Sequence, residues 1–167
     1  MARDVGNAKS RGGCSHRADI VCILAEGNVL GEKDLVKLCA SLDPVMALPV
    51  YVFCSLPDFI LPDGLAAFCT VRELEGLTAV IEQSDAQRLR LPYTYESRLI
   101  TLRVHSSLEA VGFIAVISRE LAQAGIPCNA IAGYCHDHIF VPVDRAEEAM
   151  TLLRGIAAGA SLGHTSI

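Results

Sequence analysis

The chain has 167 residues and a mass of 17.9 kDa, and 51% of its residues are hydrophobic, which is enough to fill one ordinary core. Its formal net charge of -5 argues against a protein that binds through phosphates, so we expect no nucleic-acid partner. No apolar run approaches the roughly 18 residues of a membrane-spanning helix, and we expect no membrane partner. Seven cysteines, an odd number without a C-x-x-C pair, predict free thiols in a reducing, cytoplasmic compartment.

The first part of the chain is rich in Gly, Ser and basic residues. Residues 1–18 are expected to be a disordered leader, with an organelle transit peptide as the alternative. The β-branched run 19–25 predicts a strand, and leucines at helical spacing predict a short amphipathic helix over 32–42. A second strand follows at 50–54, and the prolines after it indicate an irregular connection over 57–62.

The middle of the chain predicts a hairpin and a stub of helix. Residues 66–73 and 77–82 flank a short turn that ends in Gly76, a residue that tolerates the positive φ of such turns. Residues 84–88 predict a helical turn, and 91–97 a connector. Apart from the run 19–25, which could be an edge strand or merely a tail, this half therefore contains one helix, three strands and a short second helix.

A strand over 98–104, the loop 105–107 and a long helix open the second half. Ser106 and Glu109 stand three residues apart, as in a capping box, which predicts that the helix begins here. Gly125 is placed to end the helix in a left-handed cap. One face of this helix is expected to carry Val111, Ile114, Ala115, Ser118, Leu121 and Ala122.

A second hairpin and a last helix complete the pattern. Residues 128–135 and 138–143 predict two strands joined by a turn at His136 and Asp137. A second capping box, from Asp144 to Glu147, predicts a helix over 145–155, and the tail 157–167 is expected to fray. The order in this half is β-α-β-β-α.

The residues of the second half carry a family resemblance. Residues 104–112 and 132–141 together resemble the ACT domain, and the chain is similar to tandem-ACT proteins, to the CASTOR-type arginine sensors and to the regulatory region of aspartate kinase. The resemblance implies an α+β, ferredoxin-like βαββαβ fold, with two units in tandem packed as one. We expect the first ACT-like unit at 19–97, the second at 98–156 and a flexible tail at 157–167. No last strand is evident after residue 155, so either the first half or the tail must supply it.

The resemblance also implies an amino-acid ligand at the start of the long helix. Free N–H groups at a helix start favour a carboxylate. Asp137 occupies the position of an acidic ligand contact in the arginine sensors, and a cationic side chain or an ammonium group could pair with it. The implied binding residues are His105, Ser106, Ser107, Leu108, Glu109, Ala110, Val111, Asn129, Ala130, Ile131 and Asp137.

Each of these residues also has a structural explanation. Ser106 could serve only as a helix cap, Asp137 could be a turn residue, and His105 a loop histidine. His136 is expected in the turn and His138 in the strand, and no third ligand follows at a recognisable spacing, so we expect no metal site. We also expect no cofactor and no catalytic residue.

These observations favour a non-catalytic regulatory protein that binds an amino acid and signals to a partner protein or to its own homodimer. One alternative is a structural module that binds a partner through its sheet and has a vestigial ligand site. The other is a small enzyme or accessory subunit that uses His105, His136 or Asp137 as an acid or base.

Overall fold

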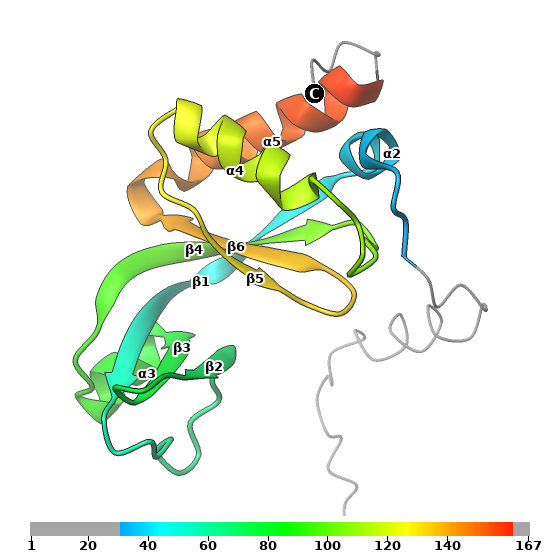
Figure 1. Cartoon of the computed structure of the whole chain (residues 1–167). Helices are drawn as coiled ribbons and strands as arrows, with labels where there is room; N and C mark the ends of the chain where they lie inside the picture. Colours follow the sequence, from blue (N-terminus) through cyan, green and yellow to red (C-terminus); the bar gives the residue numbers. More distant parts are fainter. Residues whose placement is uncertain (1–30, 162–167) are drawn as a thin grey trace, which may run out of the picture. The chain divides into compact units, whose positions relative to one another are not determined.

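A computed structural model describes residues 31–161, which form one six-stranded antiparallel sheet (Figure 1). The strand order is β2-β3-β1-β4-β6-β5. The predicted strand at 19–25, the leader at 1–18 and the residues after 161 lie outside the described part of the chain. The strands are β1 (Asp43–Leu56), β2 (Cys69–Arg72), β3 (Leu77–Glu82), β4 (Thr94–Arg103), β5 (Asn129–Ala132) and β6 (Asp137–Pro142).

Two long strands at the centre of the sheet, β1 and β4, each take part in the sheets of both units. The later residues of β1 pair with β3, while its first residues, Asp43 to Met46, pair with β4 from Arg103 to Ile100. The last strand expected for the second unit is thus supplied by the first half of the chain. The first unit has the strand order β2-β3-β1-β4, and the second has the corresponding order β5-β6-β4-β1. Strands β1 and β4 thus occupy opposite positions in the two units.

Three helices cover one face of the second unit: α2 (Leu35–Ala40), α4 (Phe113–Gln123) and α5 (Ala146–Ser161) (Figure 1). Strand alternation directs one row of β4 and β6 side chains toward these helices. That row includes Ile100 and Ile139, both fully buried. They pack with Leu38, Ile117, Leu121 and Leu153 in the largest core cluster.

The first unit is smaller and less regular. Its helix α3 (Gln83–Leu89) packs with β1 and β3, but residues 57–68, between β1 and β2, form turns and no helix. Leu61 and Leu65 from this segment still close the core over Val52 and Ile81. Only the second unit therefore presents the start of a long helix next to its sheet.

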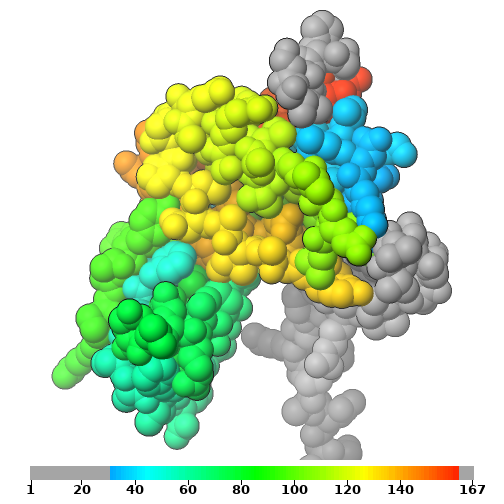
Figure 2. Space-filling model, in the orientation of Figure 1, coloured from blue at the N-terminus to red at the C-terminus, as the bar shows by residue number. Residues whose placement is uncertain are grey.

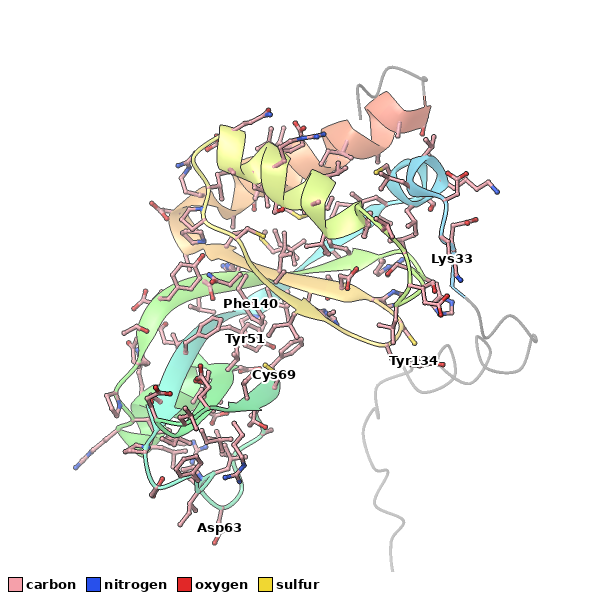
Figure 3. The ribbon with its side chains drawn as sticks, viewed as in Figure 1. Lys33, Tyr51, Asp63, Cys69, Tyr134 and Phe140 are labelled. Atoms are coloured by element: carbon pink, nitrogen blue, oxygen red, sulfur yellow. The ribbon has the colours of Figure 1, made fainter. Side chains whose placement is uncertain are left out.

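The face of the sheet opposite to α4 and α5 is closed by an aromatic cluster around Phe140, which is fully buried (Figure 3). Phe68, just before β2, lies 5.5 Å from Phe140 on β6 between ring centroids, and Tyr51 lies 5.9 Å from it. Three strands separate β2 from β6, which would be about 19 Å in a flat sheet. The sheet is therefore strongly curled, and Phe140 fills the concave side.

Several predicted boundaries are wrong in the first half and at the C-terminal end. The helix predicted over 32–42 is only α2, while β1 begins at Asp43, well before the predicted 50–54. Strand β1 contains two prolines: Pro44 pairs with Leu102, and Pro49 lies where the register with β4 shifts between Met46 and Val50. The last helix runs to Ser161, because Ala160 is buried in the core and holds the turn that was expected to fray.

The second hairpin also differs from its prediction. Its turn lies at residues 133–136, and Asp137 is the first residue of β6, paired with Ala132 and Leu102. The capping box predicted from Asp144 to Glu147 is replaced by a short 3-10 helix, η1 (Val143–Arg145), which has no side-chain cap and leads directly into α5. Gly125, with φ of 68°, follows α4 as expected.

The aromatic cluster predicts a large cost for removing its central ring. Phe140→Ala should lower the free energy of unfolding by about 3–5 kcal/mol, because it leaves a cavity that the curled sheet cannot close. Urea denaturation measures this loss. Leu74→Ala is the matched control, since Leu74 is 96% exposed and its truncation should change stability by less than about 0.5 kcal/mol. A Phe140→Ala cost below about 1 kcal/mol would contradict this account of the core.

Candidate functional site

Asp137 is a buried carboxylate at the start of β6. Strand alternation places its side chain in the same row as Ile139 and Val141, on the face that α4 and α5 cover. Only 7% of the residue is exposed. Its Oδ2 accepts a hydrogen bond of 3.3 Å from Ser106 Oγ, and Ser106 is itself buried. The interpretation of Asp137 as a turn residue is therefore wrong, since it is the first residue of β6.

The segment between β4 and α4 is a loop, and the helix begins at Phe113 rather than near Ser106. The predicted capping box does not form, because Ser106 Oγ donates to Asp137 and Glu109 pairs with Lys33. Ser107 Oγ instead accepts from the Glu109 amide, at 3.2 Å. The buried side of α4 consequently shifts away from Val111 and Ala115, and its buried residues are Phe113, Val116, Ile117 and Leu121.

A cavity of about 200 Å³ lies between this loop, the start of α4 and the row of Asp137. That volume is smaller than the roughly 300–1,000 Å³ of sites for drug-sized ligands, so it suits a small metabolite. Among the described residues that line it, Asp137 is the only one with a charged side chain. The lining residues are Ser106, Ser107, Leu108, Ala110, Gly112, Phe113, Ile114, Ala115, Ala132 and Asp137.

The cavity brings a negative group close to a positive one. Gly112, with φ of 95°, caps α4 without a side-chain hydrogen bond, and the first bond of the helix runs from the Val116 amide to the Gly112 carbonyl. The amides of Phe113, Ile114 and Ala115 thus have no partner within the helix, and they carry the positive end of its dipole. The site can therefore receive a ligand with both an anionic and a cationic group.

Burial is the main influence on the ionisation of Asp137. It raises the pKa of the carboxyl group above its ordinary value of 3.8. The hydrogen bond from Ser106 and the positive charge of His138 and His136 oppose this and lower the pKa. A cationic ligand group would act in the same direction, by stabilising the carboxylate.

The structure brings together most of the loop residues expected at the site, but not those from β5. Ser106, Ser107, Leu108, Ala110 and Asp137 line the cavity. His105, Glu109 and Val111 do not, and neither do Asn129, Ala130 and Ile131. Asn129 and Ile131 pair with Phe140 and His138 on the opposite face of the sheet, while Ala132 shares the row of Asp137 and lines the cavity. Alternation along a strand whose register was known would have selected Ala132.

The histidines do not converge with Asp137 on a reaction centre. His136 lies in the turn, where its Nδ1 is 3.2 Å from the Val104 carbonyl and must carry the proton. His138 lies on the opposite face, with Thr101 Oγ1 3.1 Å from its Nδ1 and Phe68 against its ring. Within residues 31–161, no group of three His, Cys, Asp or Glu side chains is arranged to hold a metal ion.

A second cavity, of about 340 Å³, lies beside the end of β1 in the first unit. It is lined by Phe53, Cys54, Ser55, Thr78, Pro92, Tyr93 and Thr94. Burial raises the pKa of the Cys54 thiol, so this cysteine is held in its neutral form. The lining has no carboxylate, no base and no long helix start, and the cavity lacks the paired charges of the site at Asp137.

Comparison with known families identifies two units in the chain. Residues 30–98 match an ACT domain, and residues 94–155 match a second one. The two matches overlap in β4, which is the strand that the two units share, and the boundary expected between 97 and 98 falls inside this strand. No curated protein matches the chain. In the described part, no helix is both long enough and apolar enough to span a bilayer.

Solved structures with the same architecture include a Vibrio cholerae protein of unknown function, described as a possible transport protein. It is 42% identical, with a TM-score of 0.66, and the match covers 75% of this chain and 97% of that protein. An Agrobacterium tumefaciens protein is 16% identical over 70% and 89% of the two chains, with a TM-score of 0.60. The regulatory subunit of aspartate kinase from Thermus flavus is 10% identical over 68% and 95%, with a TM-score of 0.52, which shows a shared fold.

The buried carboxylate predicts a pH-dependent stability difference between the wild type and Asp137→Asn. Because the folded state raises the pKa of Asp137, it binds the proton more tightly than the unfolded chain does. The wild type should therefore lose stability as the pH rises from 3.8 through the folded pKa, whereas the Asn variant cannot ionise and lacks this loss. Urea denaturation of both proteins across that range measures the difference, in which all other titrating groups cancel. Parallel stability profiles would contradict the burial of Asp137.

A second prediction concerns the hydrogen bond from the Ser106 hydroxyl, which lowers the pKa of Asp137 and so opposes the effect of burial. Ser106→Ala removes a donor that stabilises the carboxylate, so the pKa of Asp137 should rise further above 3.8. NMR titration of the Asp137 side-chain carboxyl measures the shift. Ser118→Ala is the matched control, because the Ser118 hydroxyl donates to the Ile114 carbonyl on α4 and has no bond to Asp137. An unchanged or lower pKa in Ser106→Ala would show that this hydrogen bond does not form.

Proposed function

Because the chain belongs to the ACT domain family, as a tandem pair, we propose that it is a regulatory protein that binds an amino acid between Asp137 and the start of α4. The observation that carries the proposal is the buried Asp137 carboxylate at a cavity that is also lined by Phe113, Ile114 and Ala115, whose amides have no partner within α4. An α-amino acid has the matching charges. Its ammonium group would pair with Asp137, and its carboxylate would accept from the amides of Phe113 to Ala115.

The remaining lining indicates which amino acids fit best. Leu108, Ala110 and Ile114 are apolar, and Asp137 is already used by the ammonium group. A small, uncharged side chain therefore fits this cavity, whereas a second carboxylate would be repelled by Asp137. With so few atoms and the cost of immobilisation, we expect dissociation constants from micromolar to millimolar. Occupancy would then follow the concentration of the metabolite in the cytoplasm, where we place the protein.

Binding would act by favouring one arrangement of the loop and of the surfaces beside it. Leu108 lines the cavity and is 70% exposed, and Val111, in the same loop, is 83% exposed. A partner protein or a second copy of the chain that packs on these side chains would sense whether the cavity is filled. The aspartate kinase regulatory subunits support a regulatory role through their shared fold.

The structural module is the second candidate, and the exposed Leu108 and Val111 favour it because they offer an apolar contact even when the cavity is empty. The two candidates differ in one measurable respect. A structural module would assemble equally well with and without amino acids, whereas a sensor would assemble differently.

The proposed function predicts a ligand-dependent increase in thermal stability. A few small, uncharged L-amino acids at millimolar concentration should raise the unfolding midpoint, because they bind only the folded state. Differential scanning fluorimetry with each of the twenty amino acids measures this. Asp137→Asn should abolish the response, and Asp144→Asn, which removes an exposed carboxylate outside the cavity, should retain it. A response to none of them, or an equal response in Asp137→Asn, would contradict the proposal.

A further inference from the structure

Gly31, Glu32 and Lys33 form a short strap along the loop that lines the proposed ligand site. Glu32 and Ser106 make a parallel bridge. The Glu32 amide donates to the His105 carbonyl at 2.9 Å, and the Ser107 amide donates to the Glu32 carbonyl, also at 2.9 Å. Figure 2 shows the start of the described chain, in blue, against the surface of this loop.

The strap forms backbone hydrogen bonds that connect the loop to a segment distant in the sequence. Between β4 and α4, residues 105–112 have no regular secondary structure apart from this bridge, and their other backbone bonds are local, such as Ala110 to Ser107. Among the described residues, both backbone hydrogen bonds from this loop to a distant segment are made with Glu32. Without the strap, the backbone around Ser106 would be free to move away from Asp137.

The fit between strap and loop leaves no space for a side chain at position 31. A Cβ on Gly31 would lie 2.4 Å from the Ser107 nitrogen and 2.5 Å from the Ser106 carbonyl carbon. These are backbone atoms, so they cannot rotate away as the end of a side chain would. Glycine is therefore required here by close packing of two backbones.

Two further contacts fix the ends of the strap and loop. Lys33 makes an ion pair with Glu109, in the second half of the loop (Lys33 is labelled in Figure 3). Leu35, two residues further on, packs beside Gly112, where an added Cβ would lie 3.2 Å from Leu35 Cδ2. Both ion-pair partners are exposed, so we expect the pair to contribute less to the position of the loop than the two backbone bonds of Glu32.

We propose that the strap Gly31–Lys33 positions the ligand site, by holding the loop so that Ser106 stays on Asp137, and that ligand binding and strap docking favour each other. This inference rests on the proposed amino-acid site. The coupling is reciprocal, because any ligand that needs the ordered loop also stabilises the strap that orders it. Whatever alters the strap would then change ligand affinity without touching the ligand.

The test compares wild type with Gly31→Ala, and uses Gly155→Ala as the matched control because an added Cβ meets nothing within 4 Å there. In Gly31→Ala the Ser107 amide should exchange with solvent faster. NMR titration should show the pKa of Asp137 falling toward 3.8, because movement of the loop exposes the carboxyl group, and this lost burial outweighs the lost hydrogen bond from Ser106, which alone would raise the pKa. His136 and His138, the other titrating groups acting on Asp137, are the same in all three proteins. Gly155→Ala should match the wild type in both readouts.

The ligand arm uses an equimolar mixture of the twenty L-amino acids as the probe. Gly31→Ala should need a concentration about 5- to 150-fold higher than wild type for the same rise in unfolding midpoint, which is the usual range of coupling between sites. If wild type does not respond to the mixture, the proposed function fails, while the Asp137 titration still decides whether the strap positions the loop. An unchanged Asp137 pKa in a folded Gly31→Ala variant would overturn the inference, and so would an unchanged response to the mixture when wild type responds.

A charge reversal provides a second test if Gly31→Ala does not fold. Lys33→Glu places two carboxylates at the exposed pair with Glu109, so it should shift the Asp137 pKa in the same direction by a smaller amount. The double variant Lys33→Glu with Glu109→Lys restores opposite charges and should restore the wild-type value. A pKa that Lys33→Glu leaves unchanged, or a shift that the double variant does not reverse, would show that this contact does not position the loop.

Discussion

The antiparallel pairing of β1 with β4 is the contact on which the rest of the structure depends. Each unit uses its own central strand and borrows the other strand of this pair as its edge strand. Neither unit therefore has a complete sheet alone. The shared pair also explains the curl of the sheet, since its register shifts near Met46 and Tyr51 bend the two strands. Phe140, Phe68 and Tyr51 then fill the concave side that this curl creates.

The candidate site follows from the same pairing. Because β6 pairs with β4, Asp137 lies opposite Leu102, close to where β4 ends and the loop to α4 begins. The loop then turns back over the carboxylate, and α4 starts beside it with three amides that have no partner within the helix. The first unit has no counterpart, since residues 57–68 do not form a helix. The two units therefore differ, since the second has a cavity next to a buried carboxylate and a helix start, whereas the cavity of the first unit is lined by neither.

Sequence patterns predicted the fold class and most elements, because hydrophobic periodicity and family motifs depend on local residues. They failed where contacts between residues distant in the sequence determine the local structure. The strand predicted at 50–54 is longer in the structure, because residues from Asp43 onward pair with β4. Ser106 and Glu109 have capping-box spacing, but Asp137 and Lys33 compete for their side chains. Asp137 was identified through its resemblance to a ligand residue, whereas its burial and the role of Ala132 require the register of β5 and β6.

The most direct test of the central claim is chemical-shift mapping of the backbone amides as the twenty-amino-acid mixture is added. We expect the largest changes at Phe113, Ile114 and Ala115 and at Asp137, because these groups would contact the two charges of the bound amino acid. The shifts of these amides should all saturate along the same binding curve, as expected for a single site. Changes confined to the cavity at Phe53 and Tyr93, or no change at saturating concentration, would contradict an amino-acid site at the start of α4.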